Sequence, residues 1–244
     1  MKKWFCRFMV FTFLGSSLLA ANPISLLVYS GAGLNEAMQE IKTVYEDTHD
    51  VTIDYIFAGS AQLLAQIQLS GKGDVLIVGS QDVYIDAEKK NFAESPQLVA
   101  HHTPCIAVQK GNPKKIYLIE DLANPGIKIL LGDPKANAIG LAAQKMIKKN
   151  NLPGIMQNTV AQTATVNELV TQLSMGQADA AIVTKDSIAN SKKLELIEIL
   201  PEKNVDLIIP VGVLTISKQK KEAQNFADFV ASSAGKEIFA KHGF

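Results

Sequence analysis

The stretch FAGSAQLLAQIQLSG, from Phe57 to Gly71, passes from an apolar strand pattern through small residues directly into a helical pattern. A second stretch, VYSGAGLNEAMQEI from Val28 to Ile41, has the same layout. The first backbone N–H groups of a helix have no partner inside the helix, and they attract negative charge. The two stretches therefore predict two exposed helix N-termini, each of which is suited to hold an anion.

Strand and helix patterns alternate along the rest of the chain. Apolar strand runs include ISLLVYS, VTIDYIFA, DVLIVGS, CIAVQK, IKILLGD, AAIVTK and LIIPVGVLTI. Helical patterns lie between them, and the last, from Lys220 to His242, has an expected break near residues 232–235. This alternation predicts an α/β fold with mostly parallel sheets flanked by helices. Ligands of such sheets sit beyond the carboxyl ends of the strands, where these helices begin.

The first 21 residues are interpreted as a secretory signal peptide. A basic start, MKKWFCR, precedes an apolar run that ends in small residues, and cleavage is expected near Ala20 or Ala21. A membrane anchor is the alternative, but the apolar run is short for a bilayer. Cys6 precedes the run, unlike the acylated cysteine of a lipoprotein. We therefore expect a soluble mature protein outside the cytoplasm.

The composition without this leader limits the kinds of partner and site. Its 21 basic and 24 acidic residues give a net charge of −3, which does not suggest a nucleic-acid or membrane-surface partner. It contains no arginine, so an anion site must use lysine, hydroxyls or backbone N–H groups. Cys105 is the only cysteine left, which rules out an intramolecular disulfide and a thiolate zinc cluster. In its apolar context, HTPCIAV, it is interpreted as an inert core residue.

No enzyme motif stands out in the sequence. G-x-S-x-G, C-x-x-C and H-E-x-x-H are all absent, and GDPKANAIG lacks the Gly-Lys-Ser/Thr of a phosphate loop. His101 and His102 are adjacent, so they would point to opposite sides of an extended chain, and we interpret them as surface or hinge residues. We therefore expect neither catalytic residues nor a cofactor.

Four predicted junctions are rich in small residues, which let the backbone approach a ligand closely. They are Ser30–Gly33, Ala58–Ala61, Asn137–Gly140 and Thr163–Val166. Ordinary helix capping is the alternative explanation, because Ser60 and Thr165 would be good N-caps without any ligand. Four such junctions in a chain without catalytic groups favour a binding cleft.

Taken together, these stretches resemble the periplasmic molybdate-binding proteins of ABC importers, which belong to the type II periplasmic binding proteins. The resemblance continues through ILLGDPKANAIGLAAQKMIKK, TVNELVTQLSMGQADAAIVTKDSI and PVGVLTISKQKKEAQNFADFVASSAGKEIFAKHGF, in order. It implies a two-lobed fold whose hinge consists of two crossover strands, near residues 103–107 and 200–206. Lobe 1 would comprise 23–104 plus 205–244, and lobe 2 would comprise 105–204.

The resemblance also implies a function and a place of action. Proteins of this family enclose a tetrahedral oxyanion between the lobes with neutral hydrogen-bond donors, which agrees with the missing arginine. This chain would then bind molybdate or tungstate as a periplasmic monomer and deliver it to an ABC transporter permease in the inner membrane. No nucleic acid is expected as a partner.

Carried over position by position, the resemblance implies a donor set. Ser60 matches the family's serine directly, and Ile139 and Val166 would offer backbone N–H groups. Gly33 stands where the family often has a hydroxyl, so only its N–H can serve, and Ser30 is a candidate for the missing hydroxyl. Thr184 stands where some members have a longer tyrosine. The matching junction of the second lobe has no carboxylate, so tetrahedral binding without direct protein–metal ligands is expected.

Other functions remain open at this point. Related receptors bind sulfate, phosphate or ferric ion, although ferric binding usually needs tyrosine or carboxylate ligands, and only Tyr29 is near a junction. An enzyme on the same fold, such as a transferase that attaches a cofactor to cysteine, would have only Cys105. The effector domain of a transcription regulator is disfavoured by the leader and by the lack of a helix-turn-helix. The sequence does not separate molybdate from tungstate.

Overall fold

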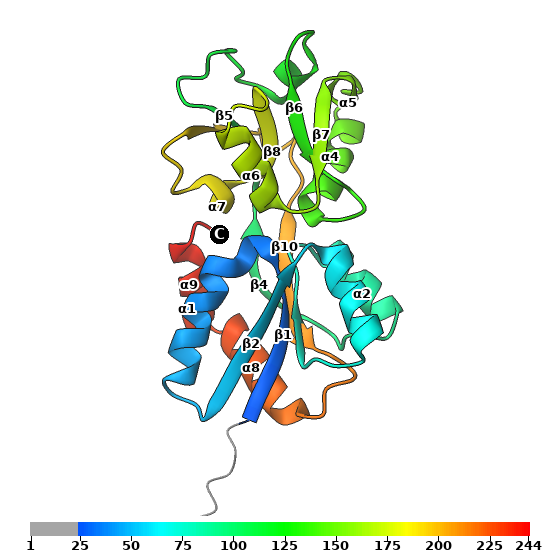
Figure 1. Ribbon diagram of the computed structural model, residues 1–244, viewed down its shortest axis with the longest axis vertical. Helices are drawn as coiled ribbons and strands as arrows, with labels where there is room; N and C mark the ends of the chain where they lie inside the picture. The colour runs from blue at the N-terminus through cyan, green and yellow to red at the C-terminus, as the bar shows by residue number, and fades with distance from the viewer. Residues whose placement is uncertain (1–23) are drawn as a thin grey trace, which may run out of the picture.

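The computed structural model describes residues 24–244, and the predicted signal peptide at 1–21 lies outside the described residues. The described chain forms two lobes stacked along the long axis of the molecule, each built on one five-stranded sheet (Figure 1). Lobe 1 holds the sheet with strand order β2-β1-β3-β10-β4, and lobe 2 holds the sheet with strand order β7-β6-β8-β5-β9. The predicted two-lobed α/β fold is confirmed.

The elements of lobe 1 come from both ends of the chain. Its strands are β1 (Ile24–Gly31), β2 (Val51–Ala58), β3 (Val75–Ile77), β4 (Gln97–His102) and β10 (Leu207–Val213). Its helices are the 3-10 turn η1 (Ala32–Leu34), α1 (Asn35–Glu46), α2 (Ser60–Ser70), α3 (Gln81–Lys89), α8 (Lys220–Ala231) and α9 (Ser233–Lys241). The expected break in the last helical region is present, because the Ser232 side chain caps α9 by accepting from the Gly235 N–H.

Lobe 2 is formed by one continuous part of the chain. Its strands are β5 (Pro104–Gln109), β6 (Ile129–Gly132), β7 (Thr159–Thr163), β8 (Ala180–Thr184) and β9 (Leu194–Glu198). Its helices are the 3-10 segment η2 (Ile119–Ala123), α4 (Ala138–Lys149), α5 (Gly154–Gln157), α6 (Val166–Ser174) and α7 (Lys185–Ile188).

The sheet of lobe 1 is covered on both faces. Side chains alternate across a strand, so Leu26 and Val28 join the core beneath α1, α8 and α9, whereas Tyr29 joins the core beneath α2 and α3. The apolar positions of α2 behave unequally, because Ile67 is buried while Leu69 is 87% exposed. The junctions between these strands and helices are thereby held at one end of the sheet.

Each sheet is mostly parallel, as predicted, with one strand running against the other four. That strand is β10 in lobe 1 and β5 in lobe 2, and both pair antiparallel with their neighbours. The parallel strands β1 and β3, and likewise β6 and β8, end at the cleft between the lobes. A chain that enters a lobe from the cleft must run away from it, so β5 and β10 run against these strands.

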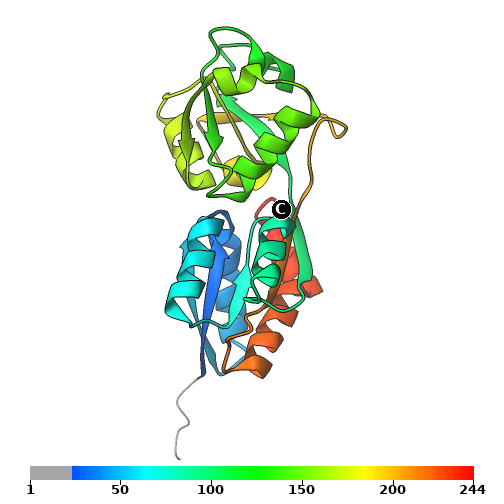
Figure 2. The ribbon, with the colours of Figure 1, turned by 90° about the vertical axis from the view of Figure 1, so that its right-hand side faces the viewer.

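Two crossings connect the lobes. Only Thr103 separates β4 from β5, and residues 199–206 lead from β9 to β10. Figure 2 shows both crossings on the same side of the molecule. The C-terminal residue Phe244 also lies between the lobes, where its ring contacts that of His102 with centroids 4.8 Å apart.

Three strands, β4, β7 and β9, were not among the predicted apolar runs. All three lie at sheet edges, where one side of the strand lacks a neighbour. Their burial is correspondingly patchy, since only one residue of β7 is fully buried. These three edge strands therefore lack the continuous apolar run that identified β3, β6 and β8, whereas the fourth edge strand, β2, was recognised from VTIDYIFA.

Candidate anion-binding site

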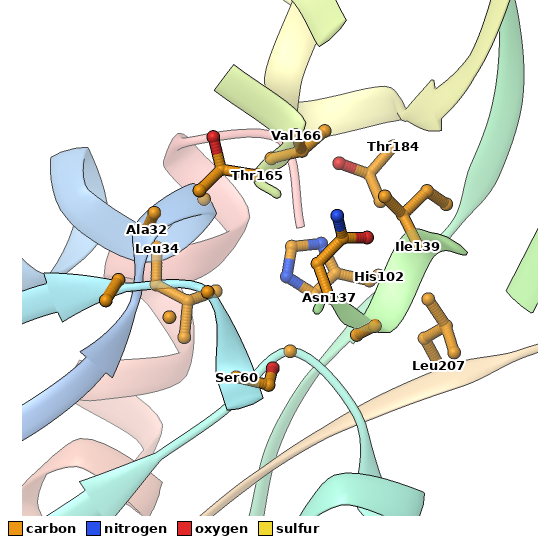
Figure 3. Close-up of a pocket in the computed structure, with 16 residues that line it drawn as sticks. Ala32, Leu34, Ser60, His102, Asn137, Ile139, Thr165, Val166, Thr184 and Leu207 are labelled. Carbon is orange, nitrogen blue, oxygen red and sulfur yellow. The ribbon is translucent and has the colours of Figure 1, made fainter. Parts of the chain in front are cut away.

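The four predicted junctions meet at one cavity between the lobes. It has a volume of about 50 Å³, which is room for roughly three to five water-sized atoms. Figure 3 shows labelled residues of both lobes around it. The lining residues come from helix starts, strand ends and the two crossings: Gly31, Ala32, Gly33, Leu34, Ala58, Gly59, Ser60, Gly79, His102, Asn137, Ala138, Ile139, Thr165, Val166, Thr184 and Leu207.

Five of the six predicted site residues line this cavity, namely Gly33, Ser60, Ile139, Val166 and Thr184. The sixth, Ser30, does not. Its side chain is fully buried within β1, and its hydroxyl lies 3.4 Å from the carbonyl oxygen of Gly31. The structure therefore offers no replacement from Ser30 for the hydroxyl that Gly33 lacks.

Ser60 lies at the start of α2, but it is not the cap of that helix. It is the first helical residue, and the preceding Gly59 holds the N-cap position without any side-chain hydrogen bond. The expectation that Ser60 is an N-cap was therefore wrong by one position. Its hydroxyl faces the cavity, in the first turn of α2, where the Ala61 N–H already donates to the Ala136 carbonyl of lobe 2 at 3.2 Å.

The two long helices that begin at the cavity in lobe 2 are capped by their own side chains. Asn137 accepts from the Gly140 N–H at 2.8 Å and donates to the Thr163 carbonyl at 2.8 Å. Thr165 accepts from the Glu168 N–H at 3.2 Å, as expected of an N-cap. The N–H groups of Ile139 and Val166 belong to the first turns of these helices, where no intrahelical acceptor exists.

The lobes approach each other closely at two glycines. A Cβ added to Gly59 would stand 2.7 Å from the Ala164 carbonyl oxygen and 3.0 Å from that of Ala136, both in lobe 2. A Cβ on Gly33 would stand 2.9 Å from Cγ1 of Val166. A side chain at Gly59 would therefore force backbone of the two lobes apart, whereas one at Gly33 would have to displace the Val166 side chain. The absence of a side chain at Gly33 thus lets the Val166 side chain of lobe 2 pack close to the Gly33 backbone.

Thr184 lines the cavity, but its hydroxyl is already engaged. It donates to Oδ2 of Asp186 at 3.1 Å, and the other carboxylate oxygen, Oδ1, lies 3.0 Å from Nδ1 of His102. Asp186 and His102 are buried, with side chains 2% and 5% exposed. This contact joins α7 of lobe 2 to β4 of lobe 1, immediately beside the cavity.

Sequence reasoning missed two features of the site. His102 was interpreted as a surface or hinge residue, yet it is a buried residue of the cavity wall, and only His101 points to solvent. A third junction in lobe 1, at Gly79 and Ser80, also reaches the cavity through Gly79. Its strand–Gly–Ser–helix pattern in DVLIVGSQDV could have been recognised by the same rule as the Phe57–Gly71 stretch.

Electrostatically, the cavity favours an anion without offering a fixed cation. No lysine is among its lining residues, which include the hydroxyl residue Ser60, the imidazole of His102 and first-turn residues of helices from both lobes. Helix N-termini carry partial positive charge, which attracts an anion. Within residues 24–244 no group of three or more metal-ligating side chains is present.

Cys105 does not take part in this chemistry. It is fully buried in β5, within the core of lobe 2. Burial, followed by the nearby Asp186 carboxylate, raises the pKa of the Cys105 thiol to about 12. A thiol that stays protonated is a poor nucleophile, which disfavours attachment of a cofactor at this position.

A cavity lined by helix starts from two lobes, with two chain crossings as the hinge, defines the class of periplasmic-type binding proteins; the second crossing, residues 199–206, is a loop and not the predicted strand. The chain matches the family described as bacterial extracellular solute-binding protein over residues 26–244, and it belongs to this family. The family comprises the substrate-binding proteins of ABC transporters and is not a family of enzymes. No helix within residues 24–244 is long and apolar enough to cross a membrane.

Three individual proteins illustrate the similarity. A Haemophilus influenzae protein described only as a binding protein is 32% identical over 223 residues, which cover 90% of each chain. The molybdate-binding protein ModA of Mycobacterium tuberculosis is 27% identical over 241 residues, 94% of this chain and 90% of that protein. The solved structure of PEB3 with bound L-phospholactate, whose source organism is Campylobacter jejuni, is 26% identical with a TM-score of 0.75 and covers 89% and 98% of the two chains.

Proposed function

We propose that this protein is an extracytoplasmic receptor that captures a tetrahedral oxyanion, molybdate or tungstate, and delivers it to the permease of an ABC importer. The observation that carries the proposal is the cavity itself. It is small, it is surrounded by helix starts from both lobes, and it uses uncharged donors rather than an arginine or lysine. The similarity to a molybdate-binding protein along almost the whole chain supports the same ligand.

The proposed donor set comes from the resemblance and is supported by the position of its residues in the cavity lining. Ser60 donates its hydroxyl, and backbone N–H groups of Gly33, Ile139 and Val166 complete the ring around the anion. The ligand then touches both lobes at once, so it binds the closed arrangement better than an open one and shifts the population toward closure. We propose a periplasmic monomer whose leader is removed near Ala20 or Ala21.

Calorimetric titration of the purified protein with molybdate, tungstate, sulfate and phosphate tests this function. A cleft of fixed donors separates anions by size, because a smaller anion cannot reach both lobes at hydrogen-bond distance. We expect tight binding of molybdate and tungstate, and sulfate binding at least about a hundredfold weaker, or roughly 2.7 kcal/mol. Equal affinities for sulfate and molybdate would contradict the proposal.

A second candidate is a receptor for a small organic phosphate. Beside the anion cavity lies a polar groove of about 370 Å³ between the lobes, and the two share Ala32 and Gly33. A phosphate group in the cavity could leave the organic part of the ligand in this groove, and PEB3 has been solved with a phosphorylated acid. L-phospholactate belongs in the same titration series. Its binding together with weak binding of molybdate would favour this candidate.

A further inference from the structure

The adjacent residues His101 and His102 each have an aspartate partner, but in opposite surroundings. His101 lies on the surface with Asp206, with side chains 62% and 60% exposed and Nδ1 2.8 Å from the carboxylate. His102 lies in the wall of the cavity with Asp186, with both side chains almost fully buried. A histidine–aspartate pair is therefore present once on the solvent-exposed surface and once in the wall of the proposed ligand cavity.

The geometry leaves one ring nitrogen of His102 for a ligand. Nδ1 is occupied by Asp186, and Nε2 makes no hydrogen bond with any residue in the described part of the chain. Nε2 lies 3.5 Å from the place where a Cβ of Gly79 would stand, and Gly79 also lines the cavity. The absence of a side chain at Gly79 thus keeps the approach to Nε2 open. Figure 3 shows the imidazole at the cavity, facing residues of both lobes.

The charge of the His102 ring decides whether Nε2 accepts or donates a hydrogen bond. A carboxylate only accepts hydrogen bonds, so Asp186 holds the hydrogen on Nδ1. A neutral ring then presents a lone pair at Nε2, which repels the oxygens of molybdate or tungstate because these carry no hydrogen. A protonated ring presents an N–H group, which donates to them as a charge-assisted hydrogen bond.

We propose that His102 is an additional ligand-binding residue that takes up a proton as the oxyanion binds and donates from Nε2 to it. This inference rests on the proposed function. The protonated His102 ring gives the cavity a positively charged side chain, in a chain whose described part has no arginine. The residue also supplies the donor that Thr184 cannot, because the Thr184 hydroxyl is engaged by Asp186.

The groups that face His102 are consistent with a transient positive charge. The Asp186 carboxylate on α7 lies against Nδ1, and the apolar ring of Phe244 contacts the His102 ring. Ala138 of α4, Gly79 of the β3–α3 junction, and the Thr184 and Leu207 side chains are uncharged, and Cys105 of the neighbouring β5 remains a neutral thiol. Lys185, which follows Thr184, turns to Glu198 at 2.7 Å on the surface.

The test is a set of titrations with sodium molybdate at about pH 6.5, 7.5 and 8.5, the range in which histidine changes its charge. At each pH, two or more buffers of different ionisation enthalpy report the number of protons taken up. We expect close to one proton per anion at the highest pH. We also expect affinity to fall as pH rises, approaching about tenfold per pH unit once the free protein carries a neutral ring.

Two variants separate the buried histidine from the exposed one. His102→Gln keeps an amide donor but removes the titration, so it should abolish proton uptake, flatten the pH dependence and weaken binding at about pH 6.5 by roughly tenfold. His101→Gln is the matched control and should leave affinity and proton uptake unchanged. If His102→Gln fails to fold, the proton count of the wild-type protein decides the question.

The possible outcomes distinguish this inference from the proposed function. Binding of molybdate with no proton uptake at any pH would overturn the role of His102 and leave the receptor function intact. A His102→Gln variant that behaves like His101→Gln would do the same. If none of the oxyanions binds the wild-type protein at any pH, the receptor function fails, and this inference fails with it.

Discussion

The two lobes prepare their helix starts in different ways. In lobe 1 the N-cap positions of α1, α2 and α3 are Leu34, Gly59 and Ser80, and none of them makes a side-chain capping bond. In lobe 2 the starts of α4 and α6 are capped by Asn137 and Thr165. The Ser80 hydroxyl is even buried without a hydrogen-bond partner in the part of the chain that the structure describes.

This difference suggests that the two lobes contact the ligand in different ways. The caps of lobe 2 fix the backbone at the starts of α4 and α6, where Ile139 and Val166 line the cavity. In lobe 1 the same positions lack a cap, and an anion can supply the acceptor that a capping side chain would otherwise provide. Binding should therefore depend on the Ser60 side chain as well as the backbone in lobe 1, and on backbone geometry alone in lobe 2.

The largest effect on affinity is expected from Gly59→Ala. The added methyl group meets two carbonyl oxygens of lobe 2 at 2.7 and 3.0 Å, and neither backbone segment can rotate away as a side chain would. We expect closure to be blocked and molybdate affinity to fall by about a hundredfold or more, near the upper end of overpacking effects. Calorimetry measures the loss, and small-angle scattering should show less compaction with ligand.

Gly31→Ala is the matched control for this variant. Gly31 also lines the cavity in lobe 1, but its added Cβ would meet no atom closer than 3.5 Å, which is ordinary contact. We expect a change in affinity of less than about fivefold. An equal loss in both variants would show that the close approach at Gly59 is not what governs closure.

The second-largest loss of molybdate affinity is expected from Ser60→Ala, which tests the role of a side chain in lobe 1. The hydroxyl faces the cavity and does not cap α2, so its removal should take away a charge-assisted hydrogen bond of about 1.5–3 kcal/mol. Affinity should fall roughly ten- to hundredfold, while the Tm of the ligand-free protein changes little. An unchanged molybdate affinity would leave binding in lobe 1 to the backbone alone.

The smallest effect on affinity is expected from Thr165→Ala, which tests lobe 2. Its hydroxyl is used to cap α6, so the variant should lose about 0.5–2 kcal/mol of folding stability. Affinity should fall by less than about fivefold, because the Val166 N–H remains in place. Thermal unfolding and calorimetry on the same sample measure both quantities. A large loss of affinity with unchanged stability would show that the Thr165 side chain binds the ligand, and would contradict the proposal that lobe 2 binds through its backbone.

The sequence by itself determined the architecture and most of the cavity. Long apolar runs such as those of β3 and β6 are buried on both faces, so their pattern does not depend on which neighbours they have. Small residues at a strand–helix junction identify a helix start locally, because capping and close approach involve residues next to each other in the chain. Local pattern therefore identified the four junctions, whereas the resemblance to the molybdate-binding family is what assigned Gly33, Ser60, Ile139 and Val166 to one ligand site.

Only the tertiary structure decided how these residues are used. Whether Ser60 caps its helix or faces the cavity is a difference of one position, which pattern does not resolve. Ser30 and Thr184 have the hydroxyl that an anion needs, but one is buried within β1 and the other is bound to Asp186. The pairing of His102 with Asp186 joins residues 84 positions apart from different lobes, and no local pattern records a contact made only when two lobes meet.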